Sequence, residues 1–303
     1  MRKFQLQMID GNELINFEWA PDQQAKAIVQ IVHNIDEHMS MYQDIAKELN
    51  KHGILVFGTD LRGMGESSLE SKEKGYFARH QGWNNSIEDL RTVNTYIRRE
   101  YMDLPIFMLG QTIGTDFSLA YAIKYCETIS GLILSGVKNH SYIKTLPKYI
   151  YLKTASILIN KWPSNYFFKN LDGSFGNKRN PAMQNAWLSS DKEFVSRFNK
   201  DTLKLSWMTN CANKDILEGQ VFLSKIKNID MIDKDFPMLL MTGEQDAYTK
   251  FSKSTRRLFT KFIKLGNNVD FKIYKKSRNR IFSDKDKIYA IKDVLEFINK
   301  NLD

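Results

Sequence analysis

The segment from Gly110 to Gly114 reads Gly-Gln-Thr-Ile-Gly, and its residue types and spacing suit nucleophilic chemistry on a carbonyl group. It follows an apolar run at residues 105–109 and precedes a stretch with helical periodicity. A hydroxyl residue between two glycines at such a turn is typical of a nucleophile elbow, because the glycines permit the sharp turn that presents the hydroxyl at a helix N-terminus. Thr112 is therefore the candidate nucleophile, and a tight turn without chemistry is the alternative.

A hydroxyl nucleophile needs a proton acceptor, which in proteins is most often a histidine. The chain has five histidines, and all of them precede residue 141. His140 is the candidate for a substitute base, because it lies just past an apolar run at residues 130–134 and so on the sheet rim expected to carry Thr112. A solvated histidine is the alternative there. The four histidines without a predicted catalytic role are His33, His38, His52 and His80.

The elements that must position these residues follow from the spacing of apolar side chains. Alternating stretches around Asp10-Gly11 predict a hairpin, and six short apolar runs predict buried strands. Strands that alternate with helices predict a mostly parallel central sheet flanked by helices. The predicted strands lie at residues 3–8, 13–19, 27–32, 54–57, 105–109, 130–134, 237–241 and 269–274, and the helices at 41–52, 86–101, 115–126, 250–264 and 285–301.

The alternation stops between residues 137 and 236, where the pattern predicts helices and loops and no clear strand. A segment this long between two strands is too long for a simple loop. We therefore expect a core formed by residues 1–136 and 237–303, with residues 137–236 as a helical cap inserted after the sixth strand. Aromatic residues at the start of this cap could line an acyl-chain pocket or contact a membrane interface, or they could pack the cap onto the sheet.

The chain of 303 residues has a formal net charge of +9, which raises the question of a nucleic-acid or anionic-membrane partner. The excess charge is spread over the predicted surface helices, so a solvated basic face is the favoured interpretation and no nucleic-acid partner is expected. An anion-binding surface in the basic C-terminal third is a weaker alternative. The nearest thing to a patch comprises Arg256, Arg257, Lys261, Lys272, Lys275, Lys276, Arg278 and Arg280.

Neither a disulfide framework nor a bound cofactor is expected. Cys126 and Cys211 are too few for a framework, and neither a signal-peptide pattern nor a membrane-length apolar run is present, so a cytoplasmic location is the simplest expectation. No cluster of Cys, His and carboxylate residues has metal-ligand spacing, and no Gly-x-Gly-x-x-Gly motif follows the first buried strand. Metal and dinucleotide sites are thus not predicted.

Four motifs in order resemble those of α/β-hydrolases of the monoacylglycerol lipase and lysophospholipase type, also described as the serine aminopeptidase S33-like group. Residues 33–38 with Tyr42 resemble His-Gly-x-x-Glu-His…Tyr, and residues 60–67 are similar to Asp-x-Arg-Gly-His-Gly-x-Ser. Residues 110–114 lie where the family has Gly-His-Ser-Met-Gly, and residues 242–246 lie where it has His-Gly-x-x-Asp. The resemblance implies an α/β-hydrolase fold.

The resemblance also implies functional positions. It makes Asp246 the triad acid and the backbone N–H groups of Ile35 and Ile113 the oxyanion hole. The alternative for Asp246 is a hydrogen bond to Asn279 or to an arginine such as Arg278 or Arg280. The departures concern the same centre: the nucleophile serine is Thr112, the histidine before it is Gln111, and the oxyanion-loop glycine is Asn34. The general-base histidine of a Tyr-x-x-x-x-His-Glu pattern is replaced by Asn279. An asparagine amide cannot accept the nucleophile's proton and return it to the leaving group.

Two functions remain open from the sequence. The favoured one is a pseudo-hydrolase with degenerate triad positions Thr112, Asp246 and Asn279, which retains a pocket for a small lipid-like or acyl ester ligand. The alternative is an atypical active carboxylesterase or lysophospholipase, with Thr112 as nucleophile and a non-standard base such as His140. A peripheral contact with an anionic membrane is a further expectation, and the sequence leaves the oligomeric state open.

Overall fold

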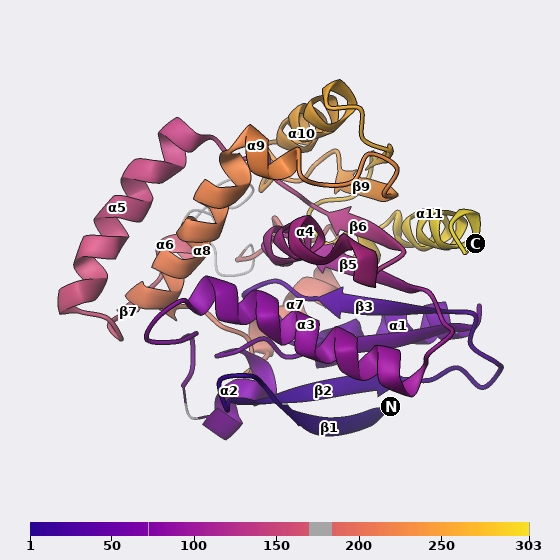
Figure 1. Ribbon diagram of the computed structural model, residues 1–303, viewed down its shortest axis with the longest axis horizontal. Helices are drawn as coiled ribbons and strands as arrows, with labels where there is room; N and C mark the ends of the chain where they lie inside the picture. The colour runs from indigo at the N-terminus through magenta and orange to yellow at the C-terminus, as the bar shows by residue number, and fades with distance from the viewer. Residues whose placement is uncertain (72, 170–183, 303) are drawn as a thin grey trace.

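The computed structural model describes residues 1–71, 73–169 and 184–302. Its centre is an eight-stranded sheet in the order β1-β2-β4-β3-β5-β6-β9-β10 (Figure 1). The β1–β2 and β2–β4 pairs are antiparallel and the remaining pairs are parallel. The strands are β1 (Arg2–Gln7), β2 (Glu13–Trp19), β3 (Ala27–Val32), β4 (Ile54–Thr59), β5 (Ile106–Gln111), β6 (Gly131–Ser135), β9 (Met238–Gly243) and β10 (Val269–Tyr274). The predicted hairpin and mostly parallel sheet are thus confirmed.

Helices cover both faces of this sheet, as its fully buried central strands require. Buried side chains of α3, α4 and α10 pack on one face, and those of α1 and α11 on the other. Figure 1 shows α3 and α4 in front of the sheet. The bounds are α1 (Gln43–Asn50), α3 (Gly82–Glu100), α4 (Gly114–Tyr125), α10 (Lys253–Lys264) and α11 (Lys287–Lys300), with 3-10 turns at Met39–Tyr42, Cys126–Thr128 and Ile281–Ser283.

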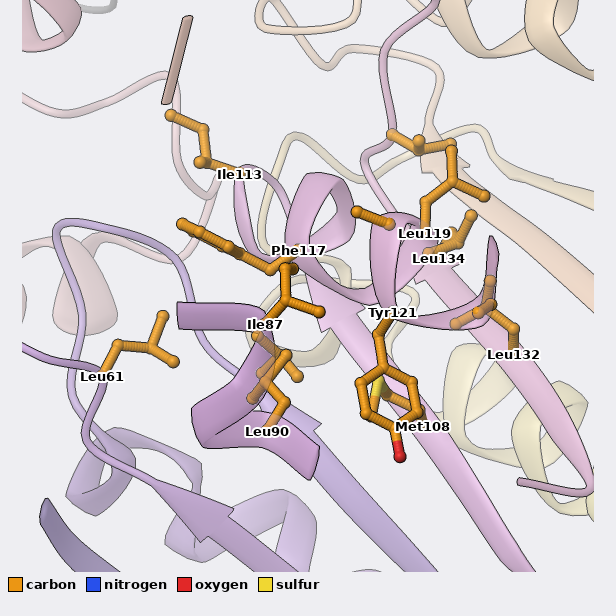
Figure 2. Packing of buried hydrophobic residues seen from close by; sticks show 14 of the residues in the cluster. Leu61, Ile87, Leu90, Met108, Ile113, Phe117, Leu119, Tyr121, Leu132 and Leu134 are labelled. Carbon is orange, nitrogen blue, oxygen red and sulfur yellow. The ribbon is translucent and has the colours of Figure 1, made fainter. Parts of the chain in front are cut away.

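The core between α3, α4 and the sheet fixes the position of the Thr112 turn. Figure 2 shows Leu90 of α3, Phe117 of α4 and Met108 of β5 in one cluster, and all three are buried. Burial of such a side chain contributes about 1.5–3 kcal/mol relative to exposure. Because β5 and α4 are both anchored in this way, the short turn between them has a fixed position.

Two features differ from the sequence prediction. The helix α2 (Gly65–Ser71) was not predicted, because its serines favour caps and turns over helix interiors. The start of this helix is stabilised by a residue outside it, because Glu66 N donates to Asp60 Oδ2 over 2.7 Å. The expectation of no strand between residues 137 and 236 was wrong, because β7 (Pro163–Ser164) and β8 (Met208–Thr209) form a short antiparallel pair.

The segment between β6 and β9 is otherwise helical where it is described. Its helices are α5 (Tyr142–Leu158), α6 (Tyr166–Lys169), α7 (Lys192–Lys200), α8 (Asn210–Ser224) and α9 (Ile226–Ile229). Figure 1 shows α5 and α8 side by side at the end of the molecule away from the C-terminus, and residues of the two helices are in contact. The division into a core and a cap at residues 137–236 stays a prediction. Among the residues with a described structure, no helix is long and apolar enough to span a membrane.

The loop between β10 and α11 holds one part of this segment. Arg280 N donates to Leu188 O over 2.8 Å, and Arg278 Nη1 donates to Ser189 O over 3.1 Å. Asp284 Oδ2 accepts from Ser190 N over 3.1 Å. Residues 188–190 are therefore bound to the core by backbone groups and not by side-chain packing alone.

Candidate active site

The turn between β5 and α4 has the geometry of a nucleophile elbow. Thr112 has φ 54°, in the left-handed region that β-branched residues rarely adopt and that costs about 1–3 kcal/mol. The backbone at the two glycines that flank Thr112 packs very closely against neighbouring atoms. A Cβ at Gly114 would lie 2.2 Å from Val32 O, and one at Gly110 would lie 2.6 Å from Ser118 Oγ. Both glycines are therefore required by close approach.

The structure brings Thr112, Asn279 and Asp246 into one hydrogen-bonded chain. Thr112 Oγ1 donates to Asn279 Oδ1 over 2.9 Å, and Asn279 Nδ2 is 3.2 Å from both carboxylate oxygens of Asp246. All three side chains are buried. Burial raises the pKa of Asp246, and the hydrogen bond from Asn279 opposes that rise.

The orientation of the Asn279 amide follows from these partners. Both carboxylate oxygens of Asp246 are acceptors, so the NH₂ group of Asn279 faces them and its oxygen faces Thr112. The hydroxyl proton of Thr112 thus points at an amide oxygen. That oxygen has no accessible pKa and cannot take the proton as an imidazole would.

Arg280 supplies further donors to the same centre. Its Nη1 donates to Thr112 Oγ1 over 2.8 Å and also to Asn279 Oδ1. Gln111 Nε2 donates to the same hydroxyl over 3.0 Å. A hydroxyl has one donor and two acceptor sites, so the Thr112 hydroxyl is fully hydrogen-bonded within the protein.

Two carboxylates hold the Arg280 guanidinium in place. Its Nη2 donates to Asp36 Oδ1 over 2.8 Å. Its Nε lies 2.6 Å from Glu37 Oε1, but the N–H is not aligned with that oxygen, so this contact is an ion pair without a directed hydrogen bond. Burial disfavours the charge of Arg280, but Glu37 and Asp36 outweigh it and raise the pKa of the guanidinium. Burial raises the pKa of Asp36, against the influence of Arg280.

The Ile113 N–H, one of the two predicted oxyanion-hole donors, has a partner within the protein. Asn34 Oδ1 accepts from it over 2.9 Å, while Asn34 Nδ2 donates to Asp36 Oδ1. Ile35, the second predicted donor residue, is fully buried in the same loop. The asparagine at the place of the family's glycine therefore occupies a hydrogen-bond donor that a substrate oxyanion would need.

His140 belongs to a different hydrogen-bonded group. Its Nε2 lies 2.7 Å from Asp116 Oδ1 on α4, and Asp116 Oδ2 accepts from Gln220 Nε2 of α8 over 3.0 Å. Within the described ranges, the hydrogen-bond partners of the Thr112 hydroxyl are Gln111, Asn279 and Arg280.

Two other histidines lie near this centre. His33 Nε2 accepts from Leu61 N over 3.0 Å while its Nδ1 lies 2.7 Å from Asn34 O, and burial lowers its pKa to about 3. His33 is thus a neutral structural residue beside Asn34. His38 Nε2 lies 3.0 Å from Asp201 Oδ2, which links the core to the segment between β6 and β9.

Sequence reasoning missed the roles of Arg280 and Asp36. The sequence pattern placed Arg280 on a solvated basic face, and the structure corrects this, because the residue is only 3% exposed and binds Asp36 and Glu37. A signal was present in the sequence. An arginine replaces the glutamate of the Tyr-x-x-x-x-His-Glu pattern, and a carboxylate, Asp36, adjoins the motif residue Glu37.

Comparison with solved structures supports the fold. The structure superposes with TM-score 0.89 on a thermostable carboxyl esterase from Bacillus coagulans in complex with glycerol, at 22% identity and over 100% of this chain and 99% of that one. It superposes with TM-score 0.76 on a monoglyceride lipase from Saccharomyces cerevisiae in complex with a substrate analog, at 20% identity, covering 99% and 94% of the two chains.

Sequence comparison points the same way. The chain is 23% identical over 298 residues to a monoacylglycerol lipase of Mycolicibacterium smegmatis, covering 97% of this chain and 95% of that protein. It is 26% identical over 246 residues to a monoglyceride lipase of Rattus norvegicus, covering 78% and 71%. The profile of the serine aminopeptidase S33 family matches residues 23–286. Because that match spans most of the chain, the protein belongs to the serine aminopeptidase S33 family and is a monoacylglycerol lipase-like α/β-hydrolase.

Proposed function

We propose that this protein is a catalytically impaired member of its family, which binds a small lipid-like or acyl ester ligand without hydrolysing it. One observation carries the proposal. The Thr112 hydroxyl donates to the Asn279 amide oxygen and accepts from Arg280 and Gln111, so it has neither a base nor a free lone pair.

The environment of the hydroxyl adds a further obstacle to ester hydrolysis. Asn34 Oδ1 competes for the Ile113 N–H that would stabilise an oxyanion, and loss of one such donor costs about 10²–10³-fold in rate. This obstacle acts independently of the missing base.

The ligand class is argued from the relatives. Two of them are a monoacylglycerol lipase and a monoglyceride lipase, and a solved relative holds a substrate analog. An acyl or lipid-like ligand bound between the core and a cap at residues 137–236 is consistent with this family. We propose the cytoplasm as the compartment, which is supported by the free cysteines Cys126 and Cys211.

A peripheral contact with an anionic membrane is the second proposal, because α5 and the residues after it expose apolar side chains. Ile143 is 83% exposed and Leu158 is 88% exposed, with Tyr151, Ile157 and Trp162 exposed beside them. Exposed apolar groups of this size on one helix and the turn after it suit insertion into the headgroup region. The net charge of +9 favours an anionic surface.

The experiment for the main proposal compares hydrolysis of a monoacylglycerol and of a p-nitrophenyl ester by the purified protein and by Thr112→Ala. We expect no turnover that depends on Thr112. Turnover by the unmodified protein that is lost in Thr112→Ala would overturn the proposal and favour the atypical esterase instead. Binding of a non-hydrolysable monoacylglycerol ether, followed by calorimetry, tests the retained ligand site.

A further inference from the structure

A cavity of about 510 Å³ lies at the carboxyl ends of β6 and β9, separate from the hydrogen-bonded chain of Thr112. Its walls come from α5 and the loop before it, from α6 and α8, and from α10 and the loop before it. Ala247, directly after Asp246, lines it, and Lys138 lies two residues after Gly136. Because Asp246 is hydrogen-bonded to Asn279 in that chain, the cavity adjoins the candidate active site.

The charge of this cavity is of one sign. Five cationic side chains line it, and no Asp or Glu is among its lining residues. In the part of the chain that the structure describes, none of the five forms an ion pair with a carboxylate. Like charges gathered without a counter-ion repel one another, and a concave site focuses their field. The five are Lys138, Lys144, Lys148, Lys250 and Arg257.

Lys138 is at the inner end of this group. Burial lowers its pKa to about 8, and Lys250 and Lys148 act in the same direction. Its Nζ lies 3.3 Å from the centroid of the Tyr248 ring, a cation–π contact that leaves its hydrogen-bond donors without a carboxylate partner.

The two carboxylates nearest to Lys138 are engaged elsewhere. Asp246 binds the Asn279 amide, and Asp116 binds His140 and Gln220. Both attract Lys138 electrostatically, but neither forms an ion pair with it. Within the described residues, the cationic side chains of this cavity therefore have no carboxylate in direct ion-pair contact.

We infer that this cavity binds the phosphate group of a phosphomonoester. A phosphomonoester carries nearly two negative charges at neutral pH and three acceptor oxygens, so it can bind several cationic groups around one cavity. Of these groups, Lys144, Lys148, Lys250 and Arg257 are exposed and Lys138 is partly buried. The aromatic residues Tyr166, Phe167 and Tyr248 line the same cavity, so an apolar portion of the ligand has a surface to contact. This inference goes beyond the proposed function and does not depend on whether Thr112 is catalytic.

The test is calorimetric binding of inorganic phosphate and glycerol 3-phosphate to the full chain at low and high salt. We expect both probes to bind, with weaker binding at high salt. The variants Lys144→Gln and Lys250→Gln come from different walls, and each should weaken binding about tenfold or more. Lys153→Gln, on the same helix as Lys144 but outside the cavity, is the control with the same charge change and should bind as the unmodified protein does.

Two further ligands separate the sources of the phosphate. If 1-hexanoyl-glycerol 3-phosphate binds more tightly than glycerol 3-phosphate, the site takes a lipid headgroup, and if the two bind equally it takes a free phosphomonoester. Either result supports the phosphate site. Absence of phosphate binding overturns it, and so does phosphate binding by Lys144→Gln and Lys250→Gln that is as tight as binding by the unmodified protein. Equal affinity for neutral 1-hexanoylglycerol and its phosphate also overturns it, while leaving the proposed acyl-ligand function intact.

Discussion

Arg280 Nη1 lies 2.8 Å from Thr112 Oγ1, although the two residues are 168 positions apart in the chain. The contact exists because the loop after β10 brings Arg280 to the elbow between β5 and α4, where Asp36 and Glu37 hold its guanidinium. The site is therefore more than a triad with substituted members. It is a complete polar network in which the Thr112 hydroxyl is one of several hydrogen-bonded groups.

This network predicts that restoring the triad alone will not restore hydrolysis. The double variant Thr112→Ser with Asn279→His leaves Arg280 and Asn34 in place, so we expect no p-nitrophenyl ester turnover above background. Adding Arg280→Gln, Asp36→Asn and Asn34→Gly frees the hydroxyl and the Ile113 N–H, and should raise the rate by about 10²-fold or more. Full activity in the double variant would show that Arg280 does not block the site.

The second prediction concerns the stability of the buried ion pairs. Arg280→Gln alone leaves Asp36 and Glu37 buried without their cation, and we expect the free energy of unfolding to fall by about 3–5 kcal/mol. Chemical denaturation measures this. Adding Asp36→Asn should recover part of the loss, and Lys275→Gln, an exposed charge change in the same loop, should stay within about 0.5 kcal/mol of the unmodified protein.

The third prediction isolates the backbone strain at Thr112. Thr112→Ser and Thr115→Ser each remove one buried methyl group and keep the hydroxyl, but only Thr112 has a positive φ. Serine tolerates that conformation better because it is not β-branched. We expect Thr112→Ser to destabilise the protein less than Thr115→Ser, by about 0.5–1 kcal/mol in denaturation experiments. Equal losses would mean that the turn is not strained.

The fourth prediction is a pH dependence of phosphate binding. The pKa of Lys138, lowered to about 8 by burial, means that it loses its charge as the pH rises from 7 to 9. Glycerol 3-phosphate stays dianionic over this range, so its affinity should be highest below pH 8 and fall above it. Lys138→Gln should remove this pH dependence of the affinity. A pH dependence that persists in that variant would show that another group causes it. The groups facing Lys138 are Asp116, Lys148, Asp246, Tyr248 and Lys250.

The fifth prediction tests the proposed membrane contact of α5. Sedimentation with vesicles rich in phosphatidylserine should recover the unmodified protein, and neutral vesicles should recover less. Ile157→Ser combined with Leu158→Ser should weaken binding about tenfold or more, because two exposed apolar groups are lost. Ile9→Ser, equally apolar and 78% exposed in the β1–β2 hairpin turn, is the control and should have no effect.

The sequence was sufficient to predict the sheet and to place Thr112, Asp246 and Asn279 at one edge of it, where the structure has them hydrogen-bonded to one another. Strands such as residues 105–109 are short apolar runs between turn signals, and motif spacing then places residues at the ends of those strands. The burial of Arg280 could not be predicted from the sequence, because a charge is buried only where it has a partner. Its partner Asp36 lies 244 positions away in the chain. Sequence reasoning also missed the bond from Ile113 N to Asn34, which depends on the direction of one side chain.

The bonds between the loop after β10 and residues 188–190 have a consequence for access to the interior. Leu188 and Ser190 are fastened to the core by backbone hydrogen bonds, so opening on that side would break them. The opposite side, where α5 begins after Ser141, is held mainly by contact between α5 and α8. The proposed phosphate cavity lies at the start of α5, so a ligand of the proposed class would reach its lysines without breaking the bonds of residues 188–190.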